Sequence, residues 1–83
     1  MEKIEKIDLL KGSKIRIVFA DQSRKTIDFE SYIGNSKLTE PLLQKEYFDQ
    51  VSIYENGRGI YWPNGFDFCA DFLKEIEPNL INQ

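Results

Sequence analysis

Two carboxylates near the end of the chain have a spacing that could support catalysis. Asp67 and Asp71 are four residues apart, and a carboxylate pair can bind a divalent cation or transfer protons. No third ligand or partner base lies nearby in the sequence. Acidic residues at this spacing also favour the first turn of a helix, because they interact with the positive end of its dipole. The helix-start interpretation therefore needs fewer assumptions.

The absence of histidine restricts the chemistry further. The chain contains no histidine, which is the usual base beside a catalytic cysteine or serine and a common ligand of zinc and iron. The single cysteine, Cys69, has apolar neighbours and is expected to be a small buried side chain. The glycine turns at residues 57–59 and 64–65 lack the spacing and lysine of a phosphate-binding loop. The sequence predicts no enzyme, no metal site and no cofactor.

A tyrosine pair beside an arginine is the most suggestive binding feature. Tyr54 and Tyr61 are expected on the outer face of a sheet, close to Arg58. Tyrosine and arginine are enriched in protein-binding surfaces, so these three residues are the candidate binding site. The alternative is that the tyrosines only shield the outer face of the sheet. In that case Tyr54 would cover Gly59 on the neighbouring strand.

Length and composition predict one cytoplasmic domain spanning residues 1–83. No apolar stretch approaches the roughly twenty residues of a membrane span, and the N-terminus lacks the pattern of a signal peptide. Residues 1–25 hold seven basic and four acidic residues, and residues 26–83 hold four basic and ten acidic ones. The acidic excess argues against a dedicated nucleic-acid binder. An accessory subunit of a nucleic-acid regulator is the alternative function, with its basic residues at Lys11, Lys14, Arg24 and Lys25.

Hydrophobic alternation predicts three antiparallel strands in the first part of the chain, at residues 4–10, 14–20 and 24–30. Three-residue turns would place Leu9 opposite Ile15 and Ile7 opposite Ile17, and in the next hairpin Ile17 opposite Ile27 and Ile15 opposite Phe29. The other face would then bring Arg16 beside both Asp8 and Asp28.

Short helical turns are expected in the middle of the chain, one at residues 31–33 and one capped by Thr39. Leu38, Leu42 and Phe48 would face the sheet. Asn56-Gly57 predicts a two-residue hairpin loop, with Ile53 opposite Ile60 and Ser52 opposite Tyr61.

A final helix is predicted over residues 69–77, capped by Asp67 and stopped by Pro78 and Asn79, with a frayed tail after it. Its apolar stripe would be Cys69, Phe72, Leu73 and Ile76. Phe48, Trp62 and Phe72 are expected in the core. The predicted fold class is α+β: an antiparallel three-stranded meander, a short helical segment, a β-hairpin and a C-terminal helix packed on the sheet.

The segment Trp62-Pro63-Asn64-Gly65-Phe66-Asp67 resembles the signature of the bacterial domain-of-unknown-function family numbered 2442. Further matches are spread along nearly the whole chain: Phe19, Asp21, Asp28, Phe29, Phe48, Val51, Ile60, Asp71 and Leu73. Gln22 stands where the family usually has glycine. The signature residues Trp62, Asn64, Gly65 and Asp67 are interpreted as structural, in turn, capping and packing roles.

The resemblance implies a small regulatory or antitoxin-like protein with no established activity and no catalytic residues to transfer. Together with the tyrosine pair, it predicts a non-enzymatic interaction domain with a protein partner. Nucleic acid would be contacted only indirectly and a membrane not at all. An exposed edge strand would also allow homo-oligomers to form.

Overall fold

The computed structural model describes residues 1–76, which fold into two three-stranded antiparallel sheets and several short helices. The first sheet contains β1 (Ile4–Leu9), β2 (Lys14–Phe19) and β3 (Arg24–Asp28), and the second contains β4 (Ser52–Ile53), β5 (Gly59–Tyr61) and β6 (Asp67–Cys69). The helices are α1 (Lys45–Phe48), α2 (Ala70–Glu75) and three 3₁₀ turns, η1 (Phe29–Tyr32), η2 (Glu40–Leu43) and η3 (Glu55–Gly57). The predicted α+β class is confirmed.

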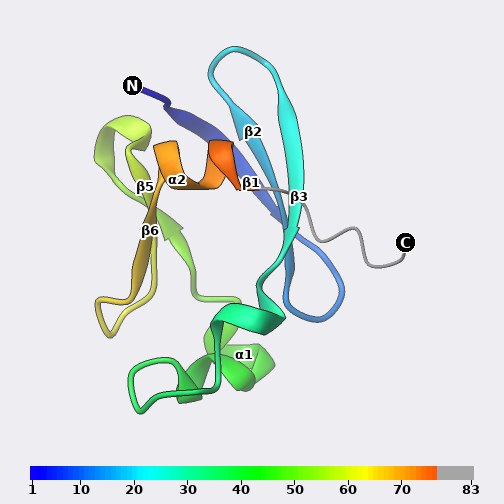
Figure 1. Cartoon of the computed structure of the whole chain (residues 1–83), viewed down its shortest axis with the longest axis vertical. Coiled ribbons are helices and arrows are strands. Elements are labelled where there is room, and N and C mark those ends of the chain that lie inside the picture. The colour runs from blue at the N-terminus through cyan, green and yellow to red at the C-terminus, as the bar shows by residue number, and fades with distance from the viewer. Residues whose placement is uncertain (77–83) are drawn as a thin grey trace.

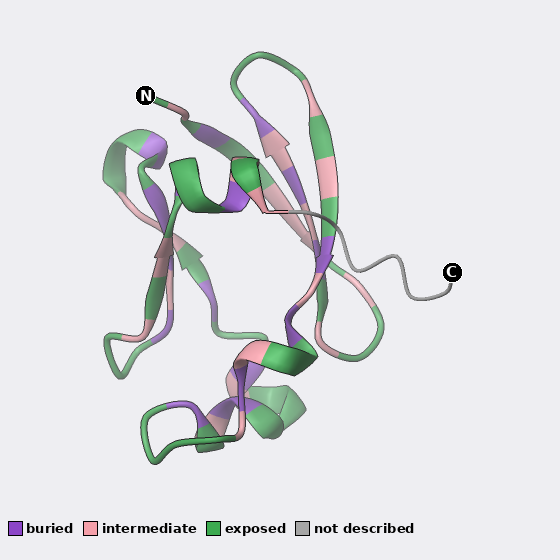
Figure 2. Cartoon of the chain, in the orientation of Figure 1, coloured by how far each residue is buried: buried purple, intermediate pink, exposed green. Residues whose placement is uncertain are grey.

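The two sheets lie side by side, with α2 near one end of the space between them and α1 near the other (Figure 1). Buried and less buried residues alternate along β2, as its half-buried strand pattern predicts (Figure 2). The side chains that fill the core come from both sheets and from the connecting turns. The largest fully buried ones are Trp62, Phe19, Phe29, Phe48, Ile15, Ile17, Leu42, Ile60 and Leu73.

The first hairpin has the predicted register. Ile7 pairs with Ile17 and Leu9 with Ile15. On the other face, Arg16 Nη1 lies 3.5 Å from Asp8 Oδ2, as the cross-strand charge pattern predicts.

The second hairpin differs from the prediction by two residues. Ile15, and not Ile17, pairs with Ile27, and Arg16 lies opposite Thr26 instead of Asp28. The cause is the turn, whose three loop residues are 20–22 because the Phe19 N–H donates to the Ser23 carbonyl at 2.9 Å. A shift of two residues keeps every side chain on its original face, so alternation alone could not detect it.

The middle segment forms short turns, but the first covers Phe29–Tyr32 instead of the predicted residues 31–33, because β3 ends at Asp28 and not at residue 30. Leu42 and Phe48 are buried there as predicted. Leu38 is 47% exposed, so its predicted contact with the sheet is wrong. Thr39 precedes η2 as expected, but its hydroxyl makes no cap bond to that turn. Instead Thr39 Oγ1 accepts a hydrogen bond from the Gly34 N–H at 3.0 Å, which closes the preceding loop.

The third hairpin has the predicted pairs, Ser52 with Tyr61 and Ile53 with Ile60. Its loop is longer than two residues, because Tyr54 N–H donates to the Gly59 carbonyl and η3 occupies the turn. The strand β6 that follows was not predicted. Its residues 67–69 pair with β5 and not with the first turn of the helix, so the prediction that Asp67 caps this helix is wrong.

Helix α2 begins one residue later than predicted and presents a different face to the core. Cys69 is its N-cap, exposed to solvent, with Sγ accepting from the Phe72 N–H at 3.4 Å. The prediction that Cys69 is buried is therefore wrong. Phe72 is 38% exposed, also against prediction, while Ala70 and Leu73 are buried. The helix ends at Glu75, with Ile76 as an extended C-cap, so the predicted run to residue 77 is wrong. The predicted stop at Pro78 and Asn79 and the frayed tail lie outside the described residues.

Candidate functional site

Tyr54, Arg58 and Tyr61, named here the aromatic stack, lie together on the outer face of the second sheet. The Arg58 guanidinium carbon is 3.9 Å from the centroid of the Tyr54 ring. The Tyr54 and Tyr61 rings are stacked, with centroids 4.5 Å apart and planes 28° apart. Arg58 is exposed and both tyrosines are half-buried. The structure therefore brings all three predicted residues into one continuous surface.

The register of the third hairpin places this stack. Ser52 lies directly opposite Tyr61, and two pairs along the ladder Tyr54 is bonded to Gly59. Opposed residues in an antiparallel ladder share a face, so both tyrosines project away from Ile53 and Ile60, which face the core. Sequence alternation was sufficient to predict this outward face.

The pairing of β6 with β5 requires glycine at position 59. A Cβ atom at this position would lie 2.4 Å from the Phe68 carbonyl oxygen. That separation is far below normal contact, so β6 can pair with β5 only because residue 59 has no side chain. The shielding interpretation of the tyrosines is thus not needed to account for the glycine.

Asp67 is a fourth member of the site, which sequence reasoning assigned to helix capping. The Tyr54 hydroxyl donates to Asp67 Oδ2 at 2.6 Å. This hydrogen bond raises the pKa of Tyr54, since loss of the phenolic proton would place a second negative charge beside the carboxylate. The Trp62–Gly65 turn, read as the link between two strands, is the signal that could have placed Asp67 opposite Tyr61.

The other signature residues have structural roles. The Trp62 Nε1–H donates to the buried Phe48 carbonyl at 2.8 Å and ties the second sheet to α1. Asn64 Oδ1 accepts from the Phe66 N–H, and its amide nitrogen donates to the Leu38 carbonyl at 2.8 Å. Gly65 has φ +93°, a value that favours glycine.

The carboxylates that opened the catalytic question do not form a pair. Asp67 is bonded to Tyr54, while Asp71 Oδ1 accepts from the Glu2 N–H at 2.7 Å. In the part of the chain that the structure describes, no three acidic or cysteine side chains are grouped so that they could hold a metal ion. Nor is any helix among residues 1–76 long and apolar enough to cross a membrane.

The four basic residues of the alternative function are divided between opposite ends of the first sheet. Lys11 lies in the turn between β1 and β2, Lys14 begins β2, and both line a groove of about 620 Å³. Arg24 and Lys25 begin β3 at the other end, and Lys25 Nζ donates to the Lys74 carbonyl at 2.7 Å. The structure therefore does not gather these residues into one basic patch.

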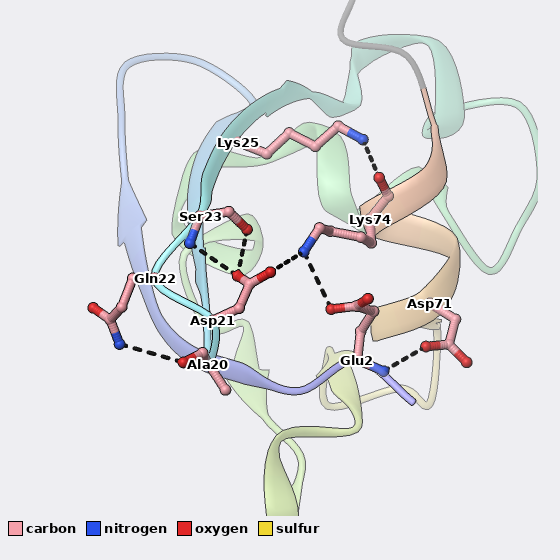
Figure 3. A network of polar contacts seen from close by, with 8 residues as sticks. All are labelled: Glu2, Ala20, Asp21, Gln22, Ser23, Lys25, Asp71 and Lys74. Carbon is pink, nitrogen blue, oxygen red and sulfur yellow. Dashed lines mark hydrogen bonds and ion pairs between the residues drawn. The ribbon is translucent and has the colours of Figure 1, made fainter.

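A polar cluster at one corner joins the N-terminal residues, the turn between β2 and β3, and α2 (Figure 3). Lys74 Nζ lies 2.9 Å from Asp21 Oδ2 and 3.2 Å from Glu2 Oε1. Hydrogen bonds from Ser23 and then from Lys74 lower the pKa of Asp21, and the bond to Asp21 raises the pKa of Lys74. The contacts of the cluster join α2 to the N-terminal residues and to the β2–β3 turn, so we interpret the cluster as structural.

Comparison with known proteins places the chain in a family. A family profile described as protein of unknown function (DUF2442) matches residues 4–79 of the sequence. No curated protein and no solved structure matches the chain. The profile match covers nearly the whole chain, including both sheets and α2, and agrees with the resemblance carried by the Trp62–Asp67 segment. The chain belongs to the family described as protein of unknown function (DUF2442).

Proposed function

We propose that this protein is a small non-enzymatic interaction module that binds another protein through Tyr54, Arg58 and Tyr61. The observation that carries the proposal is the continuous stack of one guanidinium and two phenol rings on the outer sheet face. Arginine and tyrosine are the residue types that most often dominate protein-binding energy.

The stack is held in place before any partner arrives. Asp67 fixes the Tyr54 hydroxyl, and the Tyr54 ring supports Arg58 on one side and Tyr61 on the other. Binding then costs little side-chain entropy, because these rotamers are already restricted. The regulatory or antitoxin-like role that the family resemblance implies requires a protein partner of this kind.

The proposal is tested by replacing the stack and comparing the proteins retained from native cells. The variant is Tyr54→Ala/Arg58→Ala/Tyr61→Ala, and the control is Lys37→Ala/Leu43→Ala, which removes exposed side chains elsewhere. Quantitative mass spectrometry should show partners retained by the wild type and the control but lost by the stack variant. An identical partner list for all three proteins would refute the surface.

A further inference from the structure

In the part of the chain that the structure describes, strand β6 lies at an edge of the second sheet and has β5 as its one neighbour. Two backbone hydrogen bonds flank the paired residues of β5 and β6. The Trp62 N–H donates to the Phe66 carbonyl at 2.9 Å just before β6, and the Ala70 N–H donates to the Arg58 carbonyl at 2.8 Å just after it. Hydrogen-bonded and non-hydrogen-bonded pairs alternate along an antiparallel ladder. Phe68, midway between these two bonds, therefore also directs its backbone groups toward β5.

Asp67 and Cys69 are the residues whose backbone groups point the other way, out of the sheet. Within residues 1–76, neither the Asp67 N–H nor its carbonyl has a hydrogen-bond partner, and the same holds for the Cys69 N–H. The Cys69 carbonyl is used, since an N-cap carbonyl accepts the first bond of its helix. Both residues are exposed. The edge thus offers two donors and one acceptor in the spacing of an unpaired strand.

An aromatic platform lies beside this edge. The Phe68 and Phe72 rings are stacked with centroids 5.8 Å apart, and Tyr32 meets them edge-on at 5.6 and 6.2 Å. Phe72 is 38% exposed, and Tyr32 and Phe68 are half-buried. The platform belongs to the face of β6 opposite the aromatic stack, because Phe68 shares the face of Ile60. Apolar side chains of an added strand would have a surface to cover here.

The charges around the edge select the partner. Asp67, Asp71 and Glu75 are the exposed acidic residues of β6 and α2. Lys74, the basic residue of these elements, is held by Glu2 and Asp21. Arg58 lines a small pocket with Cys69 and Asp71, and its guanidinium packs on the Tyr54 ring, so acidic side chains outnumber basic ones along this edge. A basic segment would therefore be attracted to this edge, whereas a second copy of β6 would bring like charges together.

The outer edge of β3 is longer but has a different character. Arg24 and Lys25 begin the strand and Asp28 ends it, and charged residues are a common means of preventing edge pairing. The exposed and half-buried side chains of β3 are Arg24, Lys25, Thr26 and Asp28, none of which is apolar or aromatic. The β6 edge is the one that combines free backbone groups with apolar surface.

We propose that the open edge of β6 binds an extended basic segment of another protein as a fourth strand of the second sheet. Asp67 and Cys69 supply the backbone hydrogen bonds, and Tyr32, Phe68 and Phe72 receive alternate apolar side chains of the segment. This is the strand-addition mode of peptide recognition, in which backbone bonds provide affinity and alternate side chains provide specificity. Asp67 belongs to both sites, since its side chain accepts from Tyr54 while its backbone serves the edge. The edge site uses none of Tyr54, Arg58 and Tyr61 themselves, so substitutions in the aromatic stack and at Cys69 test the two proposals separately.

The test uses a phage-displayed library of short random peptides selected on the full-length chain, followed by affinity measurements on two variants. Cys69→Pro removes the outward N–H and places a ring at the edge, while φ −81° at this N-cap is compatible with proline. Cys69→Ala loses the same Sγ cap but keeps the N–H. Selected peptides should alternate apolar residues with lysine or arginine. Cys69→Pro should weaken their binding by about tenfold or more, and Cys69→Ala by less than about threefold.

Hydrogen exchange on the wild type gives a second measurement that does not depend on the folding of Cys69→Pro. The Asp67 and Cys69 amide protons should exchange more slowly when a selected peptide is bound. N-methylation of the peptide at alternate positions should abolish binding, and methylation at the intervening positions should be tolerated. The proposal is overturned if no peptide is enriched, if enriched peptides are acidic, if both Cys69 variants bind equally, or if protection appears elsewhere.

Discussion

The two sheets have the same number of strands, yet different features hold each together. Strands of the first sheet are five or six residues long, and Ile15, Ile17 and Ile27 bury one face completely or nearly so. Strands of the second sheet are two or three residues long. Close backbone approach at Gly59 and a group of aromatic rings take the place of strand length there, while Gly57 brings the turn η3 against the Ile4 backbone of β1. Buried aliphatic side chains along longer strands therefore support the first sheet, and close backbone approach together with aromatic packing supports the second.

The largest effect that would test this contrast is expected at Gly59. In Gly59→Ala, the added Cβ would lie 2.4 Å from the Phe68 carbonyl, so β6 must move away from β5. We expect a loss of about 3 kcal/mol in the free energy of unfolding, measured by urea denaturation. The control is Gly12→Ala in the first sheet, where nothing lies within 4 Å of the added atom. Because Gly12 has a left-handed φ, Gly12→Ala should lower the free energy of unfolding by only about 1 kcal/mol. An equal loss in the two variants would contradict the proposed difference between the sheets.

A somewhat smaller effect is expected from Trp62→Phe. The substitution leaves the buried Phe48 carbonyl without its donor and opens a cavity beside Phe29. Together these should lower the free energy of unfolding by about 2–3 kcal/mol. Ile15→Val, which removes one methyl group from the first sheet, should cost about 1 kcal/mol. If the order of the two losses is reversed, aromatic packing is not the main support of the second sheet.

A small gain in stability is expected from Gln22→Gly. Gln22 has φ +76° in the turn between β2 and β3, a conformation that glycine adopts without strain. We expect the free energy of unfolding to rise by about 0.5–1 kcal/mol. Asn56→Gly, at φ +74° in the second sheet, should gain less, because asparagine tolerates this region better than glutamine does. Measuring the Tm of the two variants by thermal unfolding compares the turns of the two sheets directly.

The smallest effect is expected at the polar corner between Lys74 and Asp21. The pKa of Asp21 is lowered in the folded state, so its charge stabilises the fold above its unfolded pKa, about 3.9. Asp21→Asn should therefore lower Tm at neutral pH, and the difference should shrink as pH falls below about 4. Lys74 has the opposite pH dependence, because its pKa is raised in the folded state. Its charge stabilises the fold below its unfolded pKa of about 10.4, and this stabilisation is lost as pH rises above that value. In a Lys74→Gln background the effect of Asp21→Asn should be smaller at neutral pH.

The sequence was sufficient for features that depend on alternation and insufficient where backbone geometry decides. The β1–β2 register and the outward face of Tyr54 and Tyr61 follow from alternation, and both predictions are confirmed. The β2–β3 register was wrong because it depends on Gln22 adopting a left-handed conformation, for which glutamine gives no signal. The same limit applies to β6, since three residues are too few to show a period.

The candidate site was found as a surface but not as a complete set of contacts. Tyr54, Arg58 and Tyr61 could be placed on one face, whereas the bond from Tyr54 to Asp67 requires the third strand of the sheet. Asp67 before an apolar run has the pattern of a helix cap, and the helix does begin only a few residues later. Local sequence could not separate these two roles.

The position of Trp62 has an optical consequence. It is the chain's single tryptophan. Its indole contacts Phe29 of η1, directly after β3, as well as Phe48 of α1 and Phe68 of β6. Its emission spectrum therefore reports on the junction of the two sheets and not on either alone. If the tryptophan emission shifts to longer wavelength before the far-ultraviolet circular dichroism is lost, the two sheets separate before their strands unfold.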